Sequence, residues 1–339
     1  MSNEKKIVIV VGPNASGKSN LAVKLAKKIN GEIISVDSRQ IYKNLDIGSG
    51  KITKKEMGGI PHHCLDVANP KKIFTAYDYK KCAQKAMQKI WVKNKIPIIV
   101  GGTGFYIDAA IGRVKLSNVP PNPKLRKKLQ KLSTTQLFNL LKKLDPKRAK
   151  NIDKNNPVRL IRAIEILEGK SLVFSQTDNS SAPAAADYLH SRHKNCPLCY
   201  RTTSRRADQA FCACESFSKT QGIHPKQILW IGIKRSSGDL KKRIHNRLLR
   251  RLQGIIKEIK SLRKNGLTWK RLFDLGLEYR YVSLYIRSKL SKEEMIKKLE
   301  TEINKYAKRQ MTYWNRNKKI HWVTSKKEAI KLILSIGCG

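Results

Sequence analysis

Gly12-Pro13-Asn14-Ala15-Ser16-Gly17-Lys18-Ser19 follows directly on the apolar run Ile7-Val8-Ile9-Val10-Val11 and precedes a segment with helical periodicity. It matches the phosphate-binding pattern G-x-x-x-x-G-K-[S/T] in the context that this pattern requires, a strand, a loop and a helix. The glycines let backbone N–H groups turn toward phosphate oxygens, Lys18 can reach an outer phosphate, and the Ser19 hydroxyl can bind Mg²⁺. An ordinary Gly- and Ser-rich turn is the alternative, and the complete context disfavours it. Residues 12–19 therefore predict a site for a diphosphate or triphosphate.

The chain is strongly basic, with 71 Lys and Arg against 25 Asp and Glu among 339 residues and a formal net charge of +46. A lysine-rich proteome can account for part of this excess, and the rest indicates a polyanionic partner such as nucleic acid. The first long apolar run, Ile7 to Val11, is too short for a signal peptide or a membrane span. The odd number of cysteines predicts a reducing compartment. We therefore expect a cytoplasmic protein that binds nucleic acid and no membrane.

A second strand is predicted at Glu32-Ile33-Ile34-Ser35-Val36, and Asp37 follows it. Because the carboxyl ends of parallel strands face one ligand crevice, Asp37 is expected at the same edge of the sheet as the phosphate loop. A carboxylate there can bind a metal or act as a base toward a second substrate, whereas a solvated strand end is the plainer interpretation. The position favours a functional role.

A third buried strand, Ile96-Pro97-Ile98-Ile99-Val100, leads into Gly101-Gly102-Thr103-Gly104. This corner brings backbone N–H groups and the Thr103 hydroxyl to the same crevice, and no acidic residue ends the strand, which disfavours a motor ATPase. His62 and His63 are adjacent, which favours a loop or substrate contact over a pair of metal ligands. Together these segments predict an α/β fold, a P-loop parallel sheet flanked by helices, with a smaller and mostly helical inserted domain.

Four motifs in fixed order resemble those of the tRNA dimethylallyltransferase (tRNA isopentenyltransferase) family. They are G-P-N-A-S-G-K-S at 12–19, S-V-D-S-R-Q-I-Y at 35–42, D-I-G-S-G-K at 46–51 and V-G-G-T-G-F-Y at 100–106. The resemblance covers nearly all of the chain apart from one insertion. It implies a monomeric prenyltransferase that moves a dimethylallyl group from its diphosphate, with Mg²⁺, to N6 of the adenosine on the 3′ side of the tRNA anticodon.

The resemblance also implies roles for individual residues. Asp37 would accept a proton from N6 or hold the amine in line, while Thr103, Arg247, Lys18 and Mg²⁺ near Ser19 would stabilise the departing diphosphate. Contacts with the anticodon stem-loop are implied for Asp37, Ser38, Arg39, Gln40, Thr103, Arg126, Val158, Arg159, Leu160, Ile161, Arg162, Tyr279, Arg280, Lys308, Arg309 and Gln310. Two positions depart from the family pattern. Glu278 replaces its usual glycine, and Ser237 stands where an arginine is frequent, with Arg235 as the candidate replacement.

Three domains are expected: a P-loop catalytic core at 1–118 and 226–339, a helical tRNA-contacting insertion at 119–173, and an atypical insertion at 174–225. In the helical part, helices are predicted from Pro123, over Thr134 to Leu144, and from Pro157 to an end at Gly169. The C-terminal part predicts a strand over 227–233, a basic helix over 239–262, and a helix from the capping box at Ser291 to Trp314.

The insertion at 174–225 contains four cysteines whose spacing permits two interpretations. A zinc site could be formed by Cys196, Cys199, Cys212 and Cys214, with His190, His193 or His224 as substitutes. Since the second pair is spaced more tightly than zinc ligands usually are, a flexible and partly disordered insertion is favoured.

Two other functions share the phosphate-binding loop. A small-molecule P-loop kinase would use it for ATP, but that interpretation explains neither the positive charge nor the basic helices. A non-catalytic RNA-binding NTPase is the second alternative, and Asp37 would then be structural.

Overall fold

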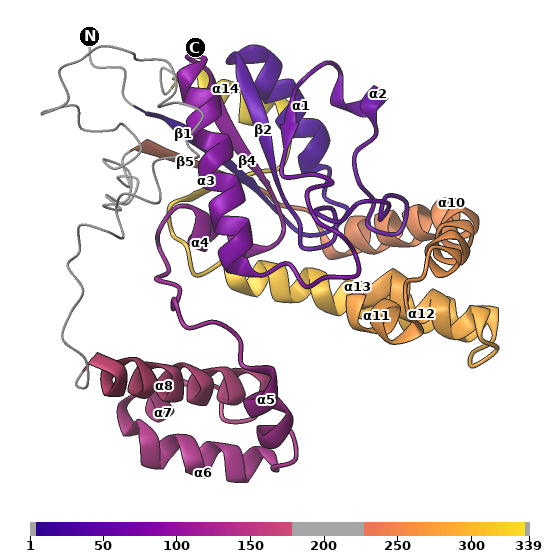
Figure 1. Ribbon diagram of the computed structural model, residues 1–339. Coiled ribbons are helices and arrows are strands. Elements are labelled where there is room, and N and C mark those ends of the chain that lie inside the picture. The colour runs from indigo at the N-terminus through magenta and orange to yellow at the C-terminus, as the bar shows by residue number, and fades with distance from the viewer. Residues whose placement is uncertain (1–4, 178–226, 336–339) are drawn as a thin grey trace, which may run out of the picture. The chain divides into compact units, whose positions relative to one another are not determined.

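The computed structural model describes residues 5–177 and 227–335, and these fall into two compact units that divide between Lys115 and Leu116 (Figure 1). The larger unit, residues 5–115 and 227–335, contains one sheet whose strand pairs are all parallel, in the order β3-β2-β4-β1-β5-β6. Its strands are β1 (Ile7–Val11), β2 (Gly31–Val36), β3 (His62–His63), β4 (Ile96–Gly101), β5 (Ile228–Ile233) and β6 (Ile320–Val323). The predicted α/β fold with a parallel sheet is confirmed.

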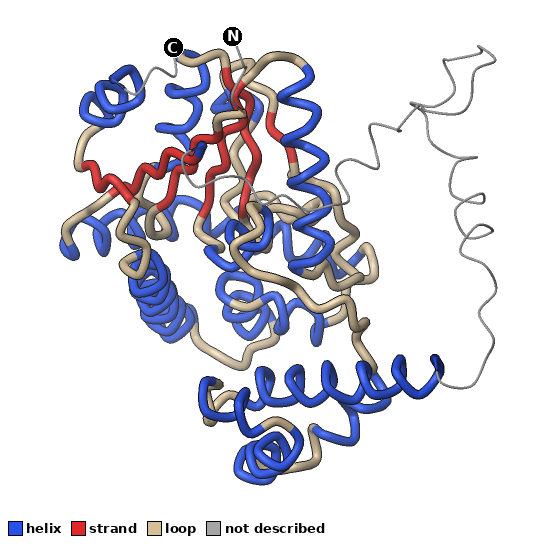
Figure 2. Tube along the Cα trace, turned by 90° about the vertical axis from the view of Figure 1, so that its left-hand side faces the viewer, coloured by secondary structure: helices blue, strands red, loops and turns tan. Residues whose placement is uncertain are grey.

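Helices cover both faces of this sheet (Figure 2). Val8 and Val10 of β1 belong to a core cluster with α1 (Lys18–Lys28) and α14 (Lys326–Ser335). Ile7, Ile9 and Val11 of β1 point the other way and belong to a second core cluster. The helices of this cluster are α3 (Ala76–Val92), α4 (Gly104–Ala110), α10 (Ser237–Lys264), α11 (Trp269–Leu275), α12 (Leu277–Ile286) and α13 (Lys292–Trp314). Burial on both faces explains why β1 is apolar at every position and shows no alternation.

The two long C-terminal helices begin at serine caps, α10 two residues before its predicted start and α13 at the predicted capping box. The Ser236 hydroxyl accepts a hydrogen bond from the Asp239 N–H and caps α10, and Ser291 and Glu294 form the predicted capping box of α13. Along α10, buried side chains recur at helical spacing, namely Ile244, Leu248, Leu252, Ile255 and Ile259. This stripe anchors α10 to the core, so its opposite, basic face lies toward solvent and the loops at the carboxyl end of the sheet. A short helix, α2 (Lys54–Met57), follows the loop at 46–51.

The smaller unit consists, in its described part, of α5 (Pro123–Leu129), α6 (Thr134–Leu144), α7 (Pro146–Asn151) and α8 (Pro157–Thr177). The expected end of α8 at Gly169 is wrong, because the helix continues to Thr177. A Cβ atom at residue 169 would lie 2.4 Å from Cγ1 of Val119. Glycine therefore allows the segment around Val119 to approach the helix, a packing role that local sequence signals do not reveal.

Glu165 is the central polar residue of this smaller unit and is only 1% exposed. It accepts hydrogen bonds from the Asn122 backbone N–H at 2.6 Å and from Arg126 Nε and Nη2 at 2.8 Å each, and it also pairs with Arg162. These donors outweigh the effect of burial and lower the pKa of Glu165 from 4.5 to about 2. Glu165 thus ties α5 and the segment before it to α8.

Replacing Glu165 with glutamine is expected to lower the free energy of unfolding by about 3 kcal/mol, because two arginines lose their buried counter-ion. Since the folded-state pKa lies below the unfolded value, this contribution is complete above about pH 5 and is lost as the pH falls toward 2. Urea unfolding at pH 7, with hydrogen exchange of α5 and α8 as a local readout, measures it. Glu168→Gln, an exposed position of the same helix, is the control. Equal stability of the two variants would contradict this role for Glu165.

Candidate active site

The loop between β1 and α1 has glycines at two positions where the backbone conformation would strain a residue with a side chain. Gly12 and Gly17 have φ values of 155° and 92°, and a Cβ at residue 12 would lie 2.9 Å from the Ser16 hydroxyl and 3.2 Å from the Ile233 carbonyl oxygen. The Asn14 N–H donates to Gln310 Oε1 at 2.8 Å, and the Ala15 N–H donates to the Asn14 side-chain oxygen at 3.0 Å. The loop N–H groups thus face oxygen acceptors already, and phosphate oxygens can take the place of these acceptors.

Lys18 follows this loop and lies at the centre of the charged groups around it. Its Nζ atom donates to the Pro13 carbonyl at 3.2 Å. Burial lowers the pKa of Lys18 from 10.5 to about 8, while Asp37 opposes and Arg247 reinforces this shift. The structure therefore brings together Lys18, Asp37 and Arg247, which come from three distant parts of the sequence.

Asp37 lies at the carboxyl end of β2, in a cavity of about 230 Å³. Its Oδ1 atom accepts hydrogen bonds from the backbone N–H groups of Arg39 at 2.8 Å and Gln40 at 3.3 Å, which fixes the turn after the strand. The phosphate loop, α10, α12 and α13 contribute the facing side chains of this cavity, including Asn14, Lys18, Ser19, Arg247, Glu278, Tyr306, Arg309 and Gln310. The cavity thus combines a carboxylate with the cations that surround the loop.

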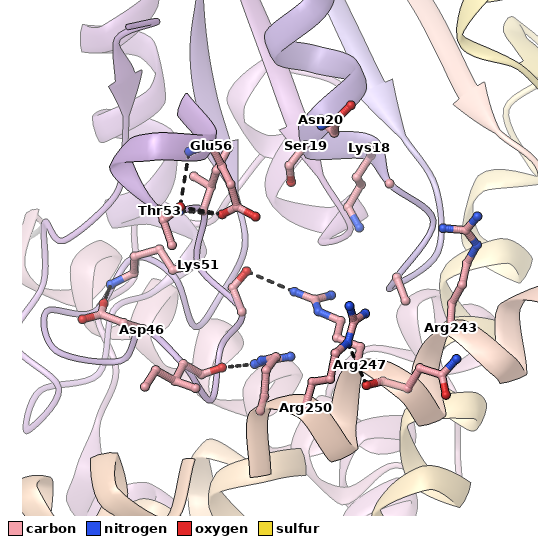
Figure 3. Close-up of a pocket in the computed structure, with 17 residues that line it drawn as sticks. Lys18, Ser19, Asn20, Asp46, Lys51, Thr53, Glu56, Arg243, Arg247 and Arg250 are labelled. Carbon is pink, nitrogen blue, oxygen red and sulfur yellow. Dashed lines mark hydrogen bonds and ion pairs between the residues drawn. The ribbon is translucent and has the colours of Figure 1, made fainter. Parts of the chain in front are cut away.

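A second, wider cleft of about 920 Å³ also borders the phosphate loop. Lys18 and Ser19 face it from α1, while Arg243, Arg247 and Arg250 face it from α10 (Figure 3). Arg247 lines both spaces, donating from Nη1 to the Asn14 side-chain oxygen at 3.2 Å and from Nη2 to the Gly50 carbonyl at 3.1 Å. It therefore joins the phosphate loop to the loop at 46–51. Nearby, Arg235 donates to the Ser16 carbonyl at 3.3 Å.

The loop at 46–51 is held by Glu258 of α10, a residue that the sequence analysis missed. Its carboxylate accepts three backbone N–H hydrogen bonds, from Asp46 at 2.9 Å, Ile47 at 2.6 Å and Gly48 at 3.0 Å. The Tyr279 hydroxyl donates to the same carboxylate at 2.9 Å. The only sign of this role in the sequence is an isolated acidic residue on a strongly basic helix.

Replacing Glu258 with glutamine is expected to lower the free energy of unfolding by about 1–3 kcal/mol, because the amide nitrogen faces N–H groups that then lack an acceptor. Urea unfolding measures the change, and Glu293→Gln, an exposed residue of α13, should stay within about 0.5 kcal/mol. If both variants unfolded at the same urea concentration, the loop would not depend on Glu258.

Tyr306 of α13 connects the turn that contains Thr103 to the cavity. The sequence analysis did not identify this residue. Thr103 lies between β4 and α4, and the Tyr306 hydroxyl lies beside the side chains of Thr103 and Gln310. Burial raises the pKa of Tyr306 to about 12, so the hydroxyl stays protonated. The signal available in the sequence was an aromatic residue within the helix predicted from Ser291 to Trp314.

Four residues that are expected to contact tRNA have buried side chains, and a tRNA contact at these positions stays a prediction. Leu160 and Ile161 lie on the inward face of α8 in the core of the smaller unit. Tyr279 is 1% exposed and holds Glu258, and Gln310 links the Asn14 N–H to the Gly102 carbonyl, with a hydrogen bond of 3.1 Å to the latter. In the structure these side chains pack in the core or hold neighbouring groups in place.

The other expected contacts reach the surface to different degrees. Arg126 and Arg162 are partly exposed but paired with Glu165. Arg280 is partly exposed and stacks on Phe273 with 4.3 Å between its guanidinium and the ring centroid. Ser38, Arg39 and Gln40 line the cavity, and the remaining positions, Val158, Arg159, Lys308 and Arg309, are exposed.

Glu278 occupies the position at which the chain departs from the family pattern. It lies directly after Gly276 and Leu277, which both have positive φ values, and its side chain is buried beside the cavity. Burial raises the pKa of this carboxyl, and the charges of Arg251 and Arg247 oppose the shift. The carboxyl thus lies next to the two arginines that contact the loop at 46–51.

No group of three His, Cys, Asp or Glu side chains within residues 5–177 and 227–335 could hold a metal ion. The proposed zinc ligands Cys196, Cys199, Cys212 and Cys214 lie outside the described residues, as do His190, His193 and His224. His62 and His63 form strand β3, not a loop; His63 pairs with Glu32 at 2.8 Å, while His62 lines the cavity. Among the described helices, none has the length and apolar character to span a membrane.

Comparisons with known proteins agree with one another. A family model described as IPP transferase matches residues 40–318. The tRNA dimethylallyltransferase 2 of Treponema denticola is 37% identical over 329 residues, covering 95% of this chain and 97% of that protein. Among solved structures, the tRNA isopentenylpyrophosphate transferase of Bacillus halodurans matches with a TM-score of 0.64 and 27% identity, covering 98% of this chain and 96% of that one.

A eukaryotic dimethylallyltransferase, described as acting on tRNA, has the same fold with a TM-score of 0.70 at 22% identity, covering 97% of this chain and 78% of that one. The family model spans most of the sequence, and the similarity to the Treponema protein extends over nearly the whole of both chains. This chain therefore belongs to the IPP transferase family.

Proposed function

We propose that this protein transfers a dimethylallyl group from dimethylallyl diphosphate to N6 of the adenosine on the 3′ side of the tRNA anticodon. The observation that carries the proposal is the cavity in which Asp37 faces the phosphate loop, Lys18 and Arg247. A group-transfer reaction of this kind needs both a site for an anionic leaving group and an acceptor for a proton, and the cavity supplies both. Membership of the IPP transferase family disfavours the two alternatives, a small-molecule kinase and an RNA-binding NTPase.

The diphosphate end of the donor fits the cationic side of the cavity. When the C1–O bond of the donor breaks, negative charge grows on the diphosphate oxygens. The loop N–H groups, Lys18 and Arg247 are positioned to stabilise this charge in the transition state. Arginine suits the task because it stays charged and binds two oxygens at once.

The amine of the adenosine forms the new C–N bond and must lose a proton. Asp37 is placed to accept this proton or to hold the amine in line with C1. Because a carboxylate is a weak base, orientation of the amine is the larger part of its role. Since the turn after β2 fixes one carboxylate oxygen, the orientation of Asp37 does not depend on the substrate.

Mg²⁺ would be held by the Ser19 hydroxyl, which faces the cleft beside Lys18. Asp46 and Glu56 line the same cleft but are engaged by Lys51 and Thr53. Oxygens of the diphosphate and water would therefore supply the other ligands, as is usual for Mg²⁺. When bound, the ion neutralises charge on the leaving diphosphate.

The tRNA side of the proposal rests on basic side chains that are exposed or partly exposed. Arg39, Arg280, Lys308 and Arg309 are placed to neutralise phosphates, and the stacked Arg280–Phe273 pair offers a platform for a base. The helical unit adds Val158 and Arg159. The target adenosine must leave its stack to reach Asp37, which suits recognition in a loop. We further propose that the enzyme works as a cytoplasmic monomer, as the family resemblance implies.

A labelling experiment distinguishes the candidate functions. Purified protein is incubated with unmodified tRNA and with either labelled dimethylallyl diphosphate or γ-labelled ATP. Prenyl transfer predicts label from the first donor on one adenosine of the tRNA and none from ATP. Transfer of the ATP label to a small molecule would support a kinase, and its release as phosphate would support an NTPase; either result without prenylation overturns the proposal.

The lowered pKa of Lys18 predicts a pH dependence of donor use. Since the donor interacts with the ammonium form, kcat/KM for dimethylallyl diphosphate should fall about tenfold per pH unit above the pKa of about 8. Lys18→Arg keeps its charge and should show lower activity but no such fall. A wild-type profile that stays flat to pH 9.5, in buffers that leave tRNA binding unchanged, would contradict the assignment of Lys18.

A further inference from the structure

Two thiols from different elements lie next to each other beside the sheet. Cys64 follows β3, and Cys82 belongs to α3, yet their Sγ atoms are only 2.8 Å apart. Both cysteines are free. A disulfide bond of about 2.05 Å would require the two sulfur atoms to approach each other by less than 1 Å.

The two thiols differ in access and in acidity. Cys64 is 3% exposed, whereas Cys82 of α3 is partly exposed. The hydrogen bond between them and the nearby Lys85 lower the pKa of Cys82, and the same hydrogen bond together with burial raises the pKa of Cys64. Cys82 is therefore the nucleophile that a reagent in solution can meet, and Cys64 is the protected thiol behind it.

We propose that Cys64 and Cys82 form a reversible disulfide site that is oxidised by low-molecular-weight disulfides such as oxidised glutathione. The juxtaposition of an accessible and a buried thiol is the arrangement of an attacking and a resolving cysteine. The site lies outside the cavity of Asp37, and it does not depend on the proposed transfer reaction.

The exchange proceeds in two steps. The Cys82 thiolate attacks one sulfur of the reagent, forms a mixed disulfide and releases one glutathione thiolate. Cys64 then loses its proton to that thiolate and attacks Cys82 Sγ, which expels the second glutathione. In total, two protein thiols are oxidised to one disulfide, and one molecule of oxidised glutathione is reduced to two molecules of glutathione. An excess of dithiol reverses both steps.

The bond would join two segments that contact β2 and the turn after it. The segment after Cys64 runs beside the strand end that carries Asp37, since the Ala68 N–H donates to the Ile41 carbonyl at 2.9 Å and the Lys43 N–H donates to the Ala68 carbonyl at 3.0 Å. On the other side, α3 is attached to β2 by the Tyr79 hydroxyl, which donates to the Ser35 carbonyl at 2.9 Å. A covalent link between Cys64 and Cys82 would restrict both at once.

Peptide mapping of the full chain after treatment with oxidised glutathione tests the proposal. We expect a linked peptide pair containing Cys64 and Cys82, lighter by two hydrogens than the reduced pair and lost again after dithiothreitol. The Cys64→Ser variant should stop at the first step and carry one stable glutathione on Cys82. The Cys82→Ser variant should leave Cys64 unmodified, because the buried thiol does not meet the reagent.

Two results would overturn the proposal. One is wild-type protein in which the Cys64–Cys82 pair stays reduced while the chain's other cysteines react. The other is glutathione on Cys64 in the Cys82→Ser variant at the rate seen for Cys82 in Cys64→Ser. Because the wild-type measurement needs no substitution, the test holds even if a variant fails to fold, which circular dichroism would reveal.

Discussion

Substitution of Asp37 by alanine is expected to lower kcat for prenyl transfer by at least about 100-fold while changing the Kd for tRNA little. The carboxylate lies in the cavity with Lys18 and Arg247, and no other carboxylate lines that cavity apart from Glu278 among the described residues. Without Asp37 the adenosine amine has neither a proton acceptor nor a group that orients it. Exposed cations near the cavity remain, so tRNA should still bind. Single-turnover prenylation and filter binding of tRNA measure the two quantities separately.

The asparagine variant separates the structural role of Asp37, in the turn after β2, from its role in the reaction. An amide oxygen can still accept the N–H groups of Arg39 and Gln40, so the turn after β2 should persist. With this oxygen held in the turn, the NH2 group of asparagine faces the adenosine amine and can neither accept its hydrogen bond nor take its proton, so Asp37→Asn should be nearly as inactive as Asp37→Ala. Asp274→Asn, at an exposed ion pair with Lys270, is the matched control and should retain full activity. Near wild-type turnover by Asp37→Ala would remove Asp37 from the reaction.

The parts of the fold that could be predicted are those specified by neighbouring residues. β1, the loop at 12–19 and α1 follow from an apolar run, two glycines and helical periodicity, all within about twenty residues. The prediction that Asp37 lies near the loop followed from a general rule for parallel sheets, and Asp37 and Lys18 line the same cavity. Local sequence signals and one rule of sheet topology were therefore sufficient to predict this part of the fold and the position of Asp37.

The parts that could not be predicted depend on contacts between residues far apart in the sequence. Glu258 meets Asp46 across more than two hundred residues, and Gln310 meets Asn14 across nearly three hundred. Nothing in the flanking sequence distinguishes these side chains from solvated ones. The same reason explains why the burial of Leu160 and Ile161 could not be predicted: a helix has a core-facing side and a solvent-facing side, and a motif that spans both does not separate them.

The Glu258 contacts also show why Arg247 matters beyond its charge. Glu258 fixes the loop at 46–51 by accepting hydrogen bonds from the N–H groups of that loop, and Arg247 binds the Gly50 carbonyl of the same loop. The second nitrogen of Arg247 binds Asn14 in the phosphate loop. The guanidinium therefore has a defined position before any substrate arrives, so its charge needs no reorganisation during the reaction.

Replacing Arg247 with alanine is accordingly expected to lower kcat by about 100-fold or more, with less than about a threefold change in the Kd for tRNA. Arg247→Lys keeps a positive charge but cannot contact Asn14 and Gly50 together, so it should recover only part of the loss. Lys257→Ala, an exposed position on the same helix that lines neither space, is the control for the loss of one positive charge. Single-turnover rates at saturating donor, compared with tRNA binding, distinguish the outcomes. If Arg247→Ala turned over normally once tRNA was saturating, Arg247 would belong to the RNA-binding surface. Lys18 and the loop N–H groups would then hold the diphosphate without it.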